Sequence, residues 1–286
     1  MVNLSVVVPV YNEEKSIVDT IIRIKETLKG IKLKSEIVIV NDGSKDNSHK
    51  ILKDVKGIVY LRHIRNKGYG ASLKTGIKKA KGEWIAITDA DGTYPIEDLK
   101  KLIKYTKICD MVIGARTKKG SKAPTIRKPA KWMIKKLAEF LTGKKIPDIN
   151  SGLRIFKKDI ALRFWNLFPN GFSFTSTITV SSMVNNYSVM FIPIQYFKRE
   201  GKSTISPIRD FVGFISLVFK IVMYFNPLKI FTPLGLALLI SSIIKGSIDF
   251  VTQNSVGAGT IMIFLTGLQI MVLALIADLI IKRTKL

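Results

Sequence analysis

The C-terminal part of the chain contains two long apolar stretches. Ile230–Ile244 carries no charged residue, and its apolar pattern continues to Val251 with only two isolated charges. Val256–Ala277 is free of charge throughout, and roughly twenty such residues span the hydrocarbon core of a bilayer. The short polar segment Thr252–Ser255 separates the two stretches. The pattern predicts a two-helix transmembrane hairpin over residues 228–286, with spans at about 230–251 and 256–281.

Basic residues lie on the outer sides of this hairpin. Lys220 and Lys229 precede the first span, and Lys282, Arg283 and Lys285 follow the second. The segment between the spans has neither Lys nor Arg. Because basic residues are enriched on the cytoplasmic side, we expect a multi-pass protein of the cell membrane with both termini and the N-terminal domain in the cytoplasm. Met1 leads directly into a strand-like run, so no signal peptide is expected.

Two further segments have the composition of interfacial helices. Phe211–Phe225 is strongly apolar but is interrupted by Lys220, so residues 208–227 are predicted to lie at the membrane interface rather than to span it. Lys118–Lys145 combines many basic residues with Trp132 and other apolar residues. Two structures fit that second segment: an amphipathic helix on the bilayer, or a basic helix packed on the N-terminal domain.

The chain has a formal net charge of +25, although 47% of its residues are hydrophobic. A basic balance of this size favours a polyanionic partner, and beside a membrane hairpin the favoured partner is a lipid phosphate. No nucleic-acid-binding signature is present, so no nucleic acid partner is expected. Cys109 is the only cysteine, which excludes an intrachain disulfide and a cysteine-based zinc site. His49 and His63 lack metal-site spacing and are expected in loops or on the surface.

Residues 1–207 are expected to form one N-terminal domain. Within it, the sequence from Leu4 to about Gly114 alternates between strand-like and helix-like segments. Their apolar residues switch between short Val- and Ile-rich runs and a spacing of three and four, which predicts an open, doubly wound α/β sheet with right-handed crossovers. The expected parallel strands are Leu4–Val8, Glu36–Val40, Ile58–Leu61, Trp84–Thr88 and Met111–Ile113. The expected helices are Glu13–Leu28, Ser44–Asp54, Gly68–Ala80 and Ile96–Tyr105. Ligands of such sheets bind beyond the carboxyl ends of the strands.

Polar residues follow three of these strands. The first strand is followed by Pro9–Glu14, and the second by Asn41–Ser44. Helix capping explains either loop singly, since Asn12 and Ser44 are ordinary N-cap residue types, but two such loops on neighbouring strands favour a nucleotide pocket.

The fourth strand is followed by Asp89-Ala90-Asp91. Two carboxylates on alternate residues repel each other unless a cation neutralises them, and Mg²⁺ also binds substrate phosphates. The glycines Gly68, Gly70 and Gly76 have the wrong spacing for a dinucleotide-binding loop, and no P-loop is present.

Taken together, these segments resemble the family 2 glycosyltransferases with the GT-A fold, in particular the dolichyl- and undecaprenyl-phosphate sugar synthases. The resemblance covers essentially the whole chain. It rests on Val6–Glu13, Glu36–Ser48, Asn66–Gly76, Trp84–Pro95, Gly114–Arg116, Asp148–Phe156, Gly171–Thr177, Pro193–Ser203 and the hairpin. It implies a Rossmann-like GT-A catalytic domain that uses a nucleotide-sugar donor and a polyprenyl phosphate acceptor.

The resemblance also implies roles for individual residues. Pro9, Tyr11, Asn12, Glu13 and Asp42 would bind the base and ribose of the nucleotide. Asp89, Ala90 and Asp91 would form the donor–metal site, with Mg²⁺ or Mn²⁺ held by the two aspartates. Arg199, Lys202 and Ser203 would hold the diphosphate. Arg116, Arg127, Ser151 and Arg154 would bind the acceptor phosphate, so the expected catalytic residues are Asp89, Asp91, Arg116 and Arg127.

One departure from the mannosyl branch of the family concerns the donor. That branch continues its aspartate pair with Leu-Gln-His-Pro, whereas this chain has Gly92-Thr93-Tyr94-Pro95, so a third side-chain ligand at Thr93 is not expected. The change favours a UDP-sugar over GDP-mannose. The expected reaction is an inverting displacement. Because an acceptor phosphate monoester is largely dianionic at neutral pH, no dedicated base is predicted.

Two other functions remain open at this point. A processive polysaccharide synthase shares the GT-A core, but the chain has Arg163-Phe164-Trp165 in place of a Gln-x-x-Arg-Trp motif, and two spans do not enclose a channel. The second alternative is a non-catalytic, membrane-docked module that binds nucleotide sugar or lipid. A homo-oligomer through the hairpins is a further possibility, because Gly235, Gly257, Gly259 and Gly267 permit close packing.

Overall fold

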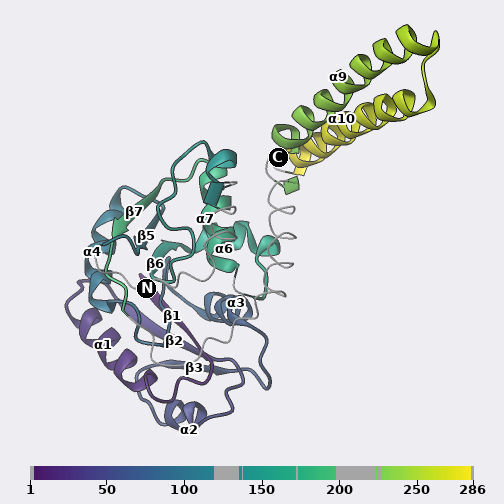
Figure 1. The fold of residues 1–286 in the computed structure, drawn as a ribbon. Coiled ribbons are helices and arrows are strands. Elements are labelled where there is room, and N and C mark those ends of the chain that lie inside the picture. The colour runs from purple at the N-terminus through teal and green to yellow at the C-terminus, as the bar shows by residue number, and fades with distance from the viewer. Residues whose placement is uncertain are drawn as a thin grey trace. The chain divides into compact units, whose positions relative to one another are not determined.

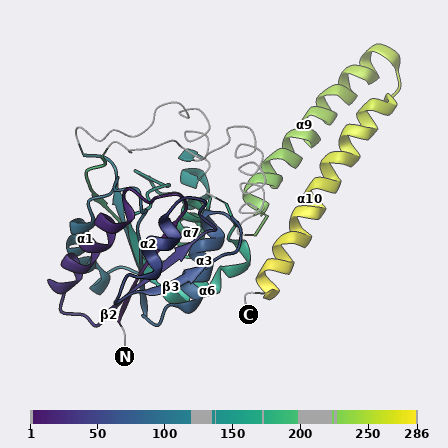
Figure 2. The same cartoon turned by 90° about the horizontal axis from the view of Figure 1, so that it is seen from below.

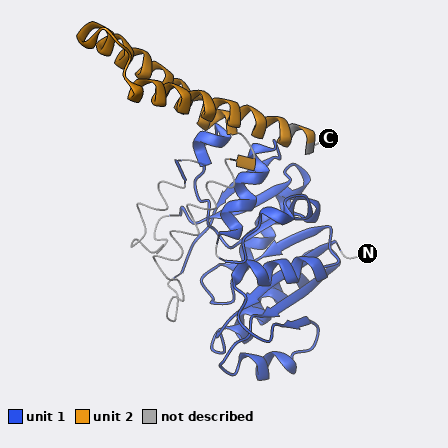
Figure 3. Ribbon diagram, turned by 90° about the vertical axis from the view of Figure 1, so that its right-hand side faces the viewer, with its two compact units in different colours: residues 1–217 blue, residues 218–286 orange. Residues whose placement is uncertain are grey.

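The computed structural model describes residues 3–118, 135–136, 138–171, 173–197, 223–224 and 227–284. The chain divides into two compact units, residues 1–217 and 218–286 (Figure 3). Most of the basic segment 118–145 and of the predicted interfacial helix 208–227 lies outside the described residues. Residues 135–136 and 138–142 are helical, and Ala138 and Leu141 are buried, so the end of the basic segment packs into the first unit.

The first unit contains a seven-stranded sheet with the order β3-β2-β1-β4-β6-β5-β7 (Figure 1). Among the strands in the described part of the chain, only β6 runs antiparallel to its neighbours, which confirms the prediction of a mainly parallel sheet. The five predicted strands are present, whereas β6, inserted between β4 and β5, and the edge strand β7 were not predicted. The strands are β1 Leu4–Val10, β2 Ser35–Asn41, β3 Val59–Arg62, β4 Trp84–Ile87, β5 Met111–Ala115, β6 Arg154–Lys157 and β7 Val189–Pro193.

Helices cover both faces of this sheet (Figures 1 and 2). On one face, α1, α2 and α4 contribute Ile17, Leu52 and Leu99 to a single hydrophobic core. On the other face lie α3, α6 and α7. The helices of this unit are α1 Ile17–Lys29, α2 Ser48–Lys53, α3 Tyr69–Lys79, α4 Leu99–Lys104, α6 Lys158–Arg163 and α7 Phe174–Val184. Short 3₁₀ turns occur at Ile96–Asp98, Tyr105–Lys107 and Trp165–Leu167.

The central strand β1 is buried along its whole length because both of its faces are covered. Val6 and Val8 face the core under α1, whereas Val7 faces α3. At that contact the helix presents Gly76, and a Cβ there would collide with Cγ1 of Val7. The glycine therefore allows α3 to pack closely on the sheet, and this close packing fixes the start of α3 beside the strand ends.

The second unit is a hairpin of α9 (Pro227–Gln253) and α10 (Ala258–Thr284). Both helices are long and apolar enough to cross a membrane. Their most apolar 18-residue segments have mean hydropathies of 1.8 and 2.3, and only 17% of each segment is buried. A soluble core would bury such helices, so the exposed apolar faces suit lipid. Gly235 and Gly267 lie at the contact between the helices, where a Cβ on Gly267 would be 3.1 Å from the Gly235 carbonyl oxygen.

The two charges within the first apolar stretch form an ion pair with each other, in which Asp249 is buried and Lys245 is exposed. Lys245 Nζ lies 2.9 Å from both carboxylate oxygens of Asp249. Asp249 Oδ2 also accepts hydrogen bonds from Thr260 Oγ1 at 2.6 Å and from the Gly257 amide at 3.3 Å. Asp249 therefore ties the end of α9 to the start of α10, which explains why an apolar span tolerates these charges.

Candidate active site

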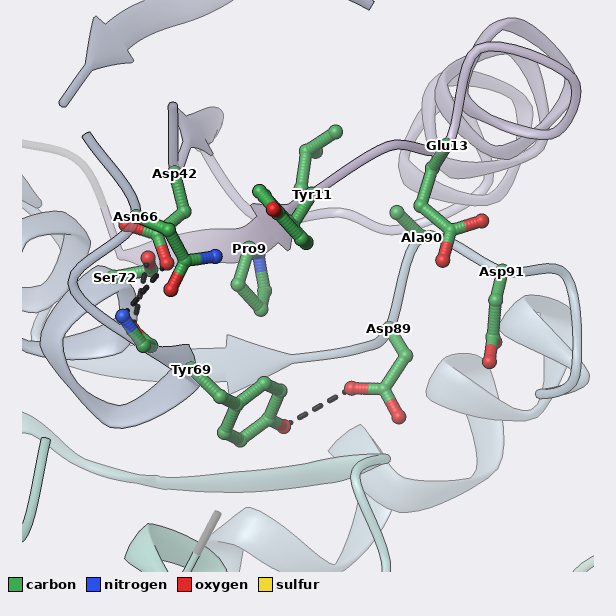
Figure 4. Close-up of a pocket in the computed structure, with 12 residues that line it drawn as sticks. Pro9, Tyr11, Glu13, Asp42, Asn66, Tyr69, Ser72, Asp89, Ala90 and Asp91 are labelled. Atoms are coloured by element: carbon green, nitrogen blue, oxygen red, sulfur yellow. Dashed lines mark hydrogen bonds between the residues drawn. The ribbon is translucent and has the colours of Figure 1, made fainter. Parts of the chain in front are cut away.

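A cavity of about 450 Å³ lies at the carboxyl ends of β1, β2 and β4 (Figure 4). This is the edge at which the sequence predicted ligand binding. The cavity is lined by Pro9, Val10, Tyr11, Glu13, Asp42, Asn66, Gly68, Tyr69, Ser72, Asp89, Ala90 and Asp91. Asp42, Asn66 and Ser72 lie toward one end of it, and Asp89 and Asp91 lie toward the other (Figure 4). The structure therefore brings three separate loops together, as predicted.

Asp89 is held from two sides. The hydroxyl of Tyr69, at the start of α3, donates a hydrogen bond to Asp89 Oδ1 at 3.0 Å (Figure 4). Burial and the neighbouring Asp89 raise the pKa of Tyr69 well above its ordinary value, so the phenol remains a donor. On the other side, a Cβ on Gly152 would lie only 2.8 Å from Asp89 Oδ2. The glycine is fixed there because its amide donates to the Tyr94 hydroxyl at 2.7 Å.

Asp91 is oriented by the turn that follows it. Its Oδ1 accepts hydrogen bonds from the Thr93 hydroxyl at 2.6 Å and from the Thr93 amide at 3.2 Å. Gly92, with φ at 69°, allows this tight turn. Thr93 is fully buried, and its hydroxyl and amide support Asp91.

The donor set at this end of the cavity fits a hard divalent cation. No group of three or more His, Cys, Asp or Glu side chains suited to a metal occurs among the described residues. Two aspartates with carboxylate oxygens nevertheless match Mg²⁺ or Mn²⁺, which retain positions for water and substrate phosphates. Asp89 and Asp91 are the residues that would hold the ion.

Asp42 organises the opposite end of the cavity. Its Oδ1 lies 2.6 Å from His63 Nδ1 and accepts the Lys67 amide at 2.9 Å, while its Oδ2 accepts the Gly68 amide at 2.8 Å. The Nε2 atom of His63 lies 2.9 Å from Thr75 Oγ1. His63 lies in the loop between β3 and α3, which agrees with the expectation of a loop or surface position, but its side chain is only 6% exposed.

Asn12 does not line the cavity. Its amide donates to Ser44 Oγ at 3.0 Å, and its side-chain oxygen accepts the Lys45 amide at 2.8 Å. These bonds join the loops that follow β1 and β2. The capping alternative for Asn12 and Ser44 is wrong, because the residues at the N-cap positions of α1 and α2 are Ser16 and Asn47.

Arg116 lies in a compact cluster of charged and aromatic residues. Its Nε and Nη2 atoms donate to the two oxygens of Asp148 at 2.7 and 2.8 Å, and its guanidinium lies 5.1 Å from the ring centre of Tyr196. Burial opposes the charge on Arg116, but Tyr94 and the Asp148 hydrogen bond raise its pKa overall. Burial likewise opposes the charge on Asp148, yet Arg116 holds the pKa of Asp148 below its usual value. Asp148 is therefore a poor proton acceptor.

Arg154 and Ser151 lie beneath the surface rather than at it. Both are fully buried. Arg154 donates to the Ser151, Thr175 and Ile149 carbonyl oxygens and to Thr179 Oγ1, and Ser151 Oγ donates to the Gly114 carbonyl oxygen. Burial lowers the pKa of Arg154 to about 10, so it stays charged at neutral pH. In this arrangement the five guanidinium N–H groups join α7 to the loop before β6, and the structure does not bring Arg154 to the cavity.

The remaining predicted site residues, Arg127, Arg199, Lys202 and Ser203, lie outside the described residues. Five residues that line the cavity were not predicted as site residues from the sequence: Val10, Asn66, Gly68, Tyr69 and Ser72. The signal for four of them was available. Asn66–Ser72 follows β3 and opens α3 at the same sheet edge, and Gly68 has a φ of 102° that a glycine adopts readily.

Comparison with known proteins identifies the class. Residues 5–165 match the family "Glycosyl transferase family 2", and residues 226–282 match the "GtrB C-terminal hairpin" family. The first match covers more than half of the chain and contains the strands that form the cavity. The chain belongs to glycosyl transferase family 2, and it is a glycosyltransferase with a C-terminal membrane hairpin.

Individual relatives agree with this assignment. A low-salt glycan biosynthesis hexosyltransferase, Agl6, from Haloferax volcanii is 28% identical over 282 residues, which cover 94% of this chain and 66% of that protein. An undecaprenyl-phosphate 4-deoxy-4-formamido-L-arabinose transferase from Pseudomonas fluorescens is 27% identical over 90% of this chain and 75% of its own length. This chain therefore spans just under two thirds of the length of the Haloferax protein, and three quarters of the Pseudomonas protein.

Solved structures show the same fold. Glucosyl-3-phosphoglycerate synthase from Mycobacterium tuberculosis aligns with a TM-score of 0.61 at 14% identity, covering 77% of this chain and 80% of that chain. TarS from S. aureus aligns with a TM-score of 0.57 at 17% identity, covering 95% of this chain and 81% of that chain. These likenesses confirm the GT-A fold.

Tyr69 and Gly152 lie against the two carboxylate oxygens of Asp89 and are called here the Asp89 clamp. This clamp predicts the effect of adding a side chain at Gly152. In Gly152→Ala the new methyl group displaces the Asp89 carboxylate, and a misplacement of about 1 Å costs roughly 100-fold in kcat/KM. Steady-state glycosyl transfer by the purified protein measures this loss, with thermal unfolding as the check on folding. Gly171→Ala is the matched control, because nothing lies within 4 Å of its Cβ position. Equal rates for the two variants would contradict the clamp.

The Arg116–Asp148 pair predicts a pH-dependent stability. Because the folded-state pKa of Asp148 is lowered, its stabilising contribution is present above the ordinary carboxyl pKa and is lost as the pH falls below about 4. Asp148→Asn leaves Arg116 buried without a counter-charge and should lower the free energy of unfolding by about 3 kcal/mol at neutral pH. Chemical unfolding in detergent across this pH range measures both effects. Asp19 is the control: its exposed carboxylate lies 3.8 Å from Arg23 Nη1, and Asp19→Asn should change stability by less than about 1 kcal/mol.

Proposed function

We propose that this protein transfers a hexose or N-acetylhexosamine from a nucleotide sugar to a polyprenyl phosphate, such as dolichyl or undecaprenyl phosphate, with inversion of the anomeric centre. A UDP-sugar is the favoured donor, and GDP-mannose is the alternative. The observation that carries the proposal is the charge of the cavity. Glu13, Asp42, Asp89 and Asp91 line it, and no lysine or arginine does so among the described residues. Such a site accepts a diphosphate only together with a divalent cation or with basic residues from outside the described part of the chain.

The named relatives support both substrates. The Pseudomonas protein is named as an undecaprenyl-phosphate transferase and the Haloferax protein as a hexosyltransferase. The TarS structure contains UDP-GlcNAc, and structures of the mycobacterial synthase contain UDP with Mg²⁺ or Mn²⁺. A cavity of about 450 Å³ is also within the range of small-ligand sites.

The chain's own residues divide the work along this cavity. We place the base and ribose beside Pro9, Tyr11 and Asp42, and the diphosphate beside Asp89 and Asp91. A divalent ion bound there supplies Lewis-acid stabilisation of the nucleoside diphosphate leaving group. Tyr69 and Thr93 keep the two aspartates oriented, so little reorganisation is needed during the reaction. The family resemblance adds Arg199, Lys202 and Ser203 on the diphosphate.

The acceptor side requires positioning more than proton removal. A phosphate monoester is largely dianionic at neutral pH, because its second pKa is about 6. Asp148 is engaged with Arg116, and its lowered pKa makes it a weak base. From the family resemblance we assign the acceptor phosphate to Arg116 and Arg127, whose planar guanidinium groups suit phosphate, and Asp148 would orient Arg116 for this contact. For Ser151 and Arg154 we propose a supporting role, which holds the loop that bears Gly152 against Asp89.

The hairpin accounts for the choice of acceptor. A polyprenyl chain remains in the bilayer, so the enzyme must work next to the membrane surface. We propose that α9 and α10 span the membrane, and that residues 1–207 and both termini lie in the cytoplasm. Residues 208–227 and the outer part of the basic segment 118–145 would then contact the headgroups.

The reaction is tested by incubating the purified full-length protein with a panel of nucleotide sugars and polyprenyl phosphate, with and without EDTA. We expect a lipid carrying one sugar, identified by mass spectrometry, and no product after the metal is removed. Asp91→Asn should reduce turnover at least roughly 100-fold, since it removes a charged metal ligand. Asp98→Asn is the matched control, because Asp98 ends the 3₁₀ turn before α4 and is not among the residues that line the cavity.

Other products would favour other functions. Long polymer would identify a processive polysaccharide synthase. Binding of nucleotide sugar without any product across the panel would identify a non-catalytic binding module. Either outcome would overturn the proposed reaction.

Membrane topology is tested with single cysteines in a Cys109→Ser background. Ser255→Cys places a thiol between α9 and α10, and Lys15→Cys places one on the exposed surface of the catalytic unit. A membrane-impermeant thiol reagent added to intact cells should label the first variant only. After the cells are opened, both variants should be labelled. Labelling of Lys15→Cys in intact cells would reverse the proposed orientation.

A further inference from the structure

His63 is a buried titratable residue to which the proposed reaction gives no task. It begins the loop between β3 and α3, and its backbone amide donates to the Asn41 carbonyl oxygen at 2.9 Å. Its ring lies between Asp42, which lines the cavity, at one nitrogen and Thr75 of α3 at the other. Because an ionised carboxylate only accepts hydrogen bonds, the Nδ1 atom of His63 carries the proton that points at Asp42.

This contact limits what Asp42 offers to a ligand. A carboxylate has about four acceptor positions, two on each oxygen. His63 Nδ1 and the Lys67 amide use both positions on Oδ1, and the Gly68 amide uses one position on Oδ2. Among the described residues no other group bonds to this carboxylate, so one acceptor position remains on a side chain that lines the cavity.

The number of remaining positions distinguishes nucleotide bases. Uracil presents a single ring N–H between two carbonyl groups, and one carboxylate oxygen satisfies it. Guanine presents a ring N–H and an adjacent amino group on the same edge, and a carboxylate binds that edge best with both oxygens. If Oδ1 is occupied, one of the two guanine donors is left without a protein partner, and a donor that loses water without gaining such a partner costs binding.

We propose that His63 is a specificity-determining positioning residue: it holds one oxygen of Asp42 inside the protein, so that the cavity recognises a base with a single ring N–H, such as uracil, in preference to guanine. The inference rests on the proposed function, because it places the base of the donor beside Asp42. It deepens that function by assigning the choice between a UDP-sugar and GDP-mannose to a particular hydrogen bond.

The test compares the binding of free UDP and GDP to the full-length protein in detergent with Mg²⁺, by calorimetry. We expect the wild-type protein to bind UDP at least roughly tenfold more tightly than GDP, the difference expected for one unsatisfied donor. His63→Asn retains an N–H near the position of Nδ1 and should keep this ratio. His63→Gln places its amide near the position of Nε2, leaves Oδ1 free to turn, and should bring the ratio close to one.

Two readouts separate this role from a purely structural one. Thr75→Val removes the partner of Nε2 but leaves the bond to Asp42, so it should retain the preference for UDP. In turnover assays the loss in His63→Gln should appear mainly in the KM for the UDP-sugar and less in kcat. A general loss of folding would instead reduce binding of both nucleotides equally in all three variants, which would overturn the assignment.

The binding results also distinguish a failure of the role of His63 from a failure of the proposed function. Equal binding of UDP and GDP by the wild-type protein, or an unchanged ratio in His63→Gln, would overturn the role of His63 while leaving a nucleotide site in place. Failure of either nucleotide to bind would overturn the proposed function and this inference together.

Discussion

The arrangement of this protein depends on the parallel pairing of β1 with β2 and β4. The register places Val10 beside Asn41 and Val7 beside Ile87, so the three strands end at one edge of the sheet. Residues that are far apart in the sequence, Asp42 and Asp89 among them, therefore line one cavity. Close packing of α3, permitted by Gly76, then brings Tyr69 to the same edge. The pairing of the backbone strands therefore determines which loops lie together at the cavity.

This dependence explains which parts were predictable from the sequence. Periodicity identifies buried strands, and the residues after a buried parallel strand must lie at the ligand-binding edge, so the loops that carry Tyr11, Asp42 and Asp91 were predicted to lie at this edge. The roles of Ser151 and Arg154 were not predictable, because they are set by partners such as Thr175 and Thr179. No local pattern announces such a pairing. Strand β6 was not predicted for a similar reason. It is short, and its position depends on pairing with β4 and β5, which are distant in the sequence.

His63 illustrates the same limit at the level of one side chain. In the sequence it is an isolated histidine without metal-site spacing, for which a loop or surface position was a reasonable expectation. In the structure it is buried because Asp42 and Thr75, 21 residues before it and 12 residues after it, occupy its two ring nitrogens. Burial of a polar ring is tolerated when both nitrogens are paired. The function of such a residue becomes visible only when its partners are known.

The distribution of charge sharpens the interpretation of the basic composition. Lysines stand in the last turns of α1, α2, α3 and α4, where they offset the negative ends of the helix dipoles. In this alternating fold those helix ends lead to the amino ends of the following strands, on the sheet edge opposite the cavity. Part of the net charge of +25 therefore stabilises helices and says nothing about a lipid partner. The cavity itself is acidic, so a negatively charged donor can bind there only with a divalent cation or with basic residues contributed by other parts of the chain.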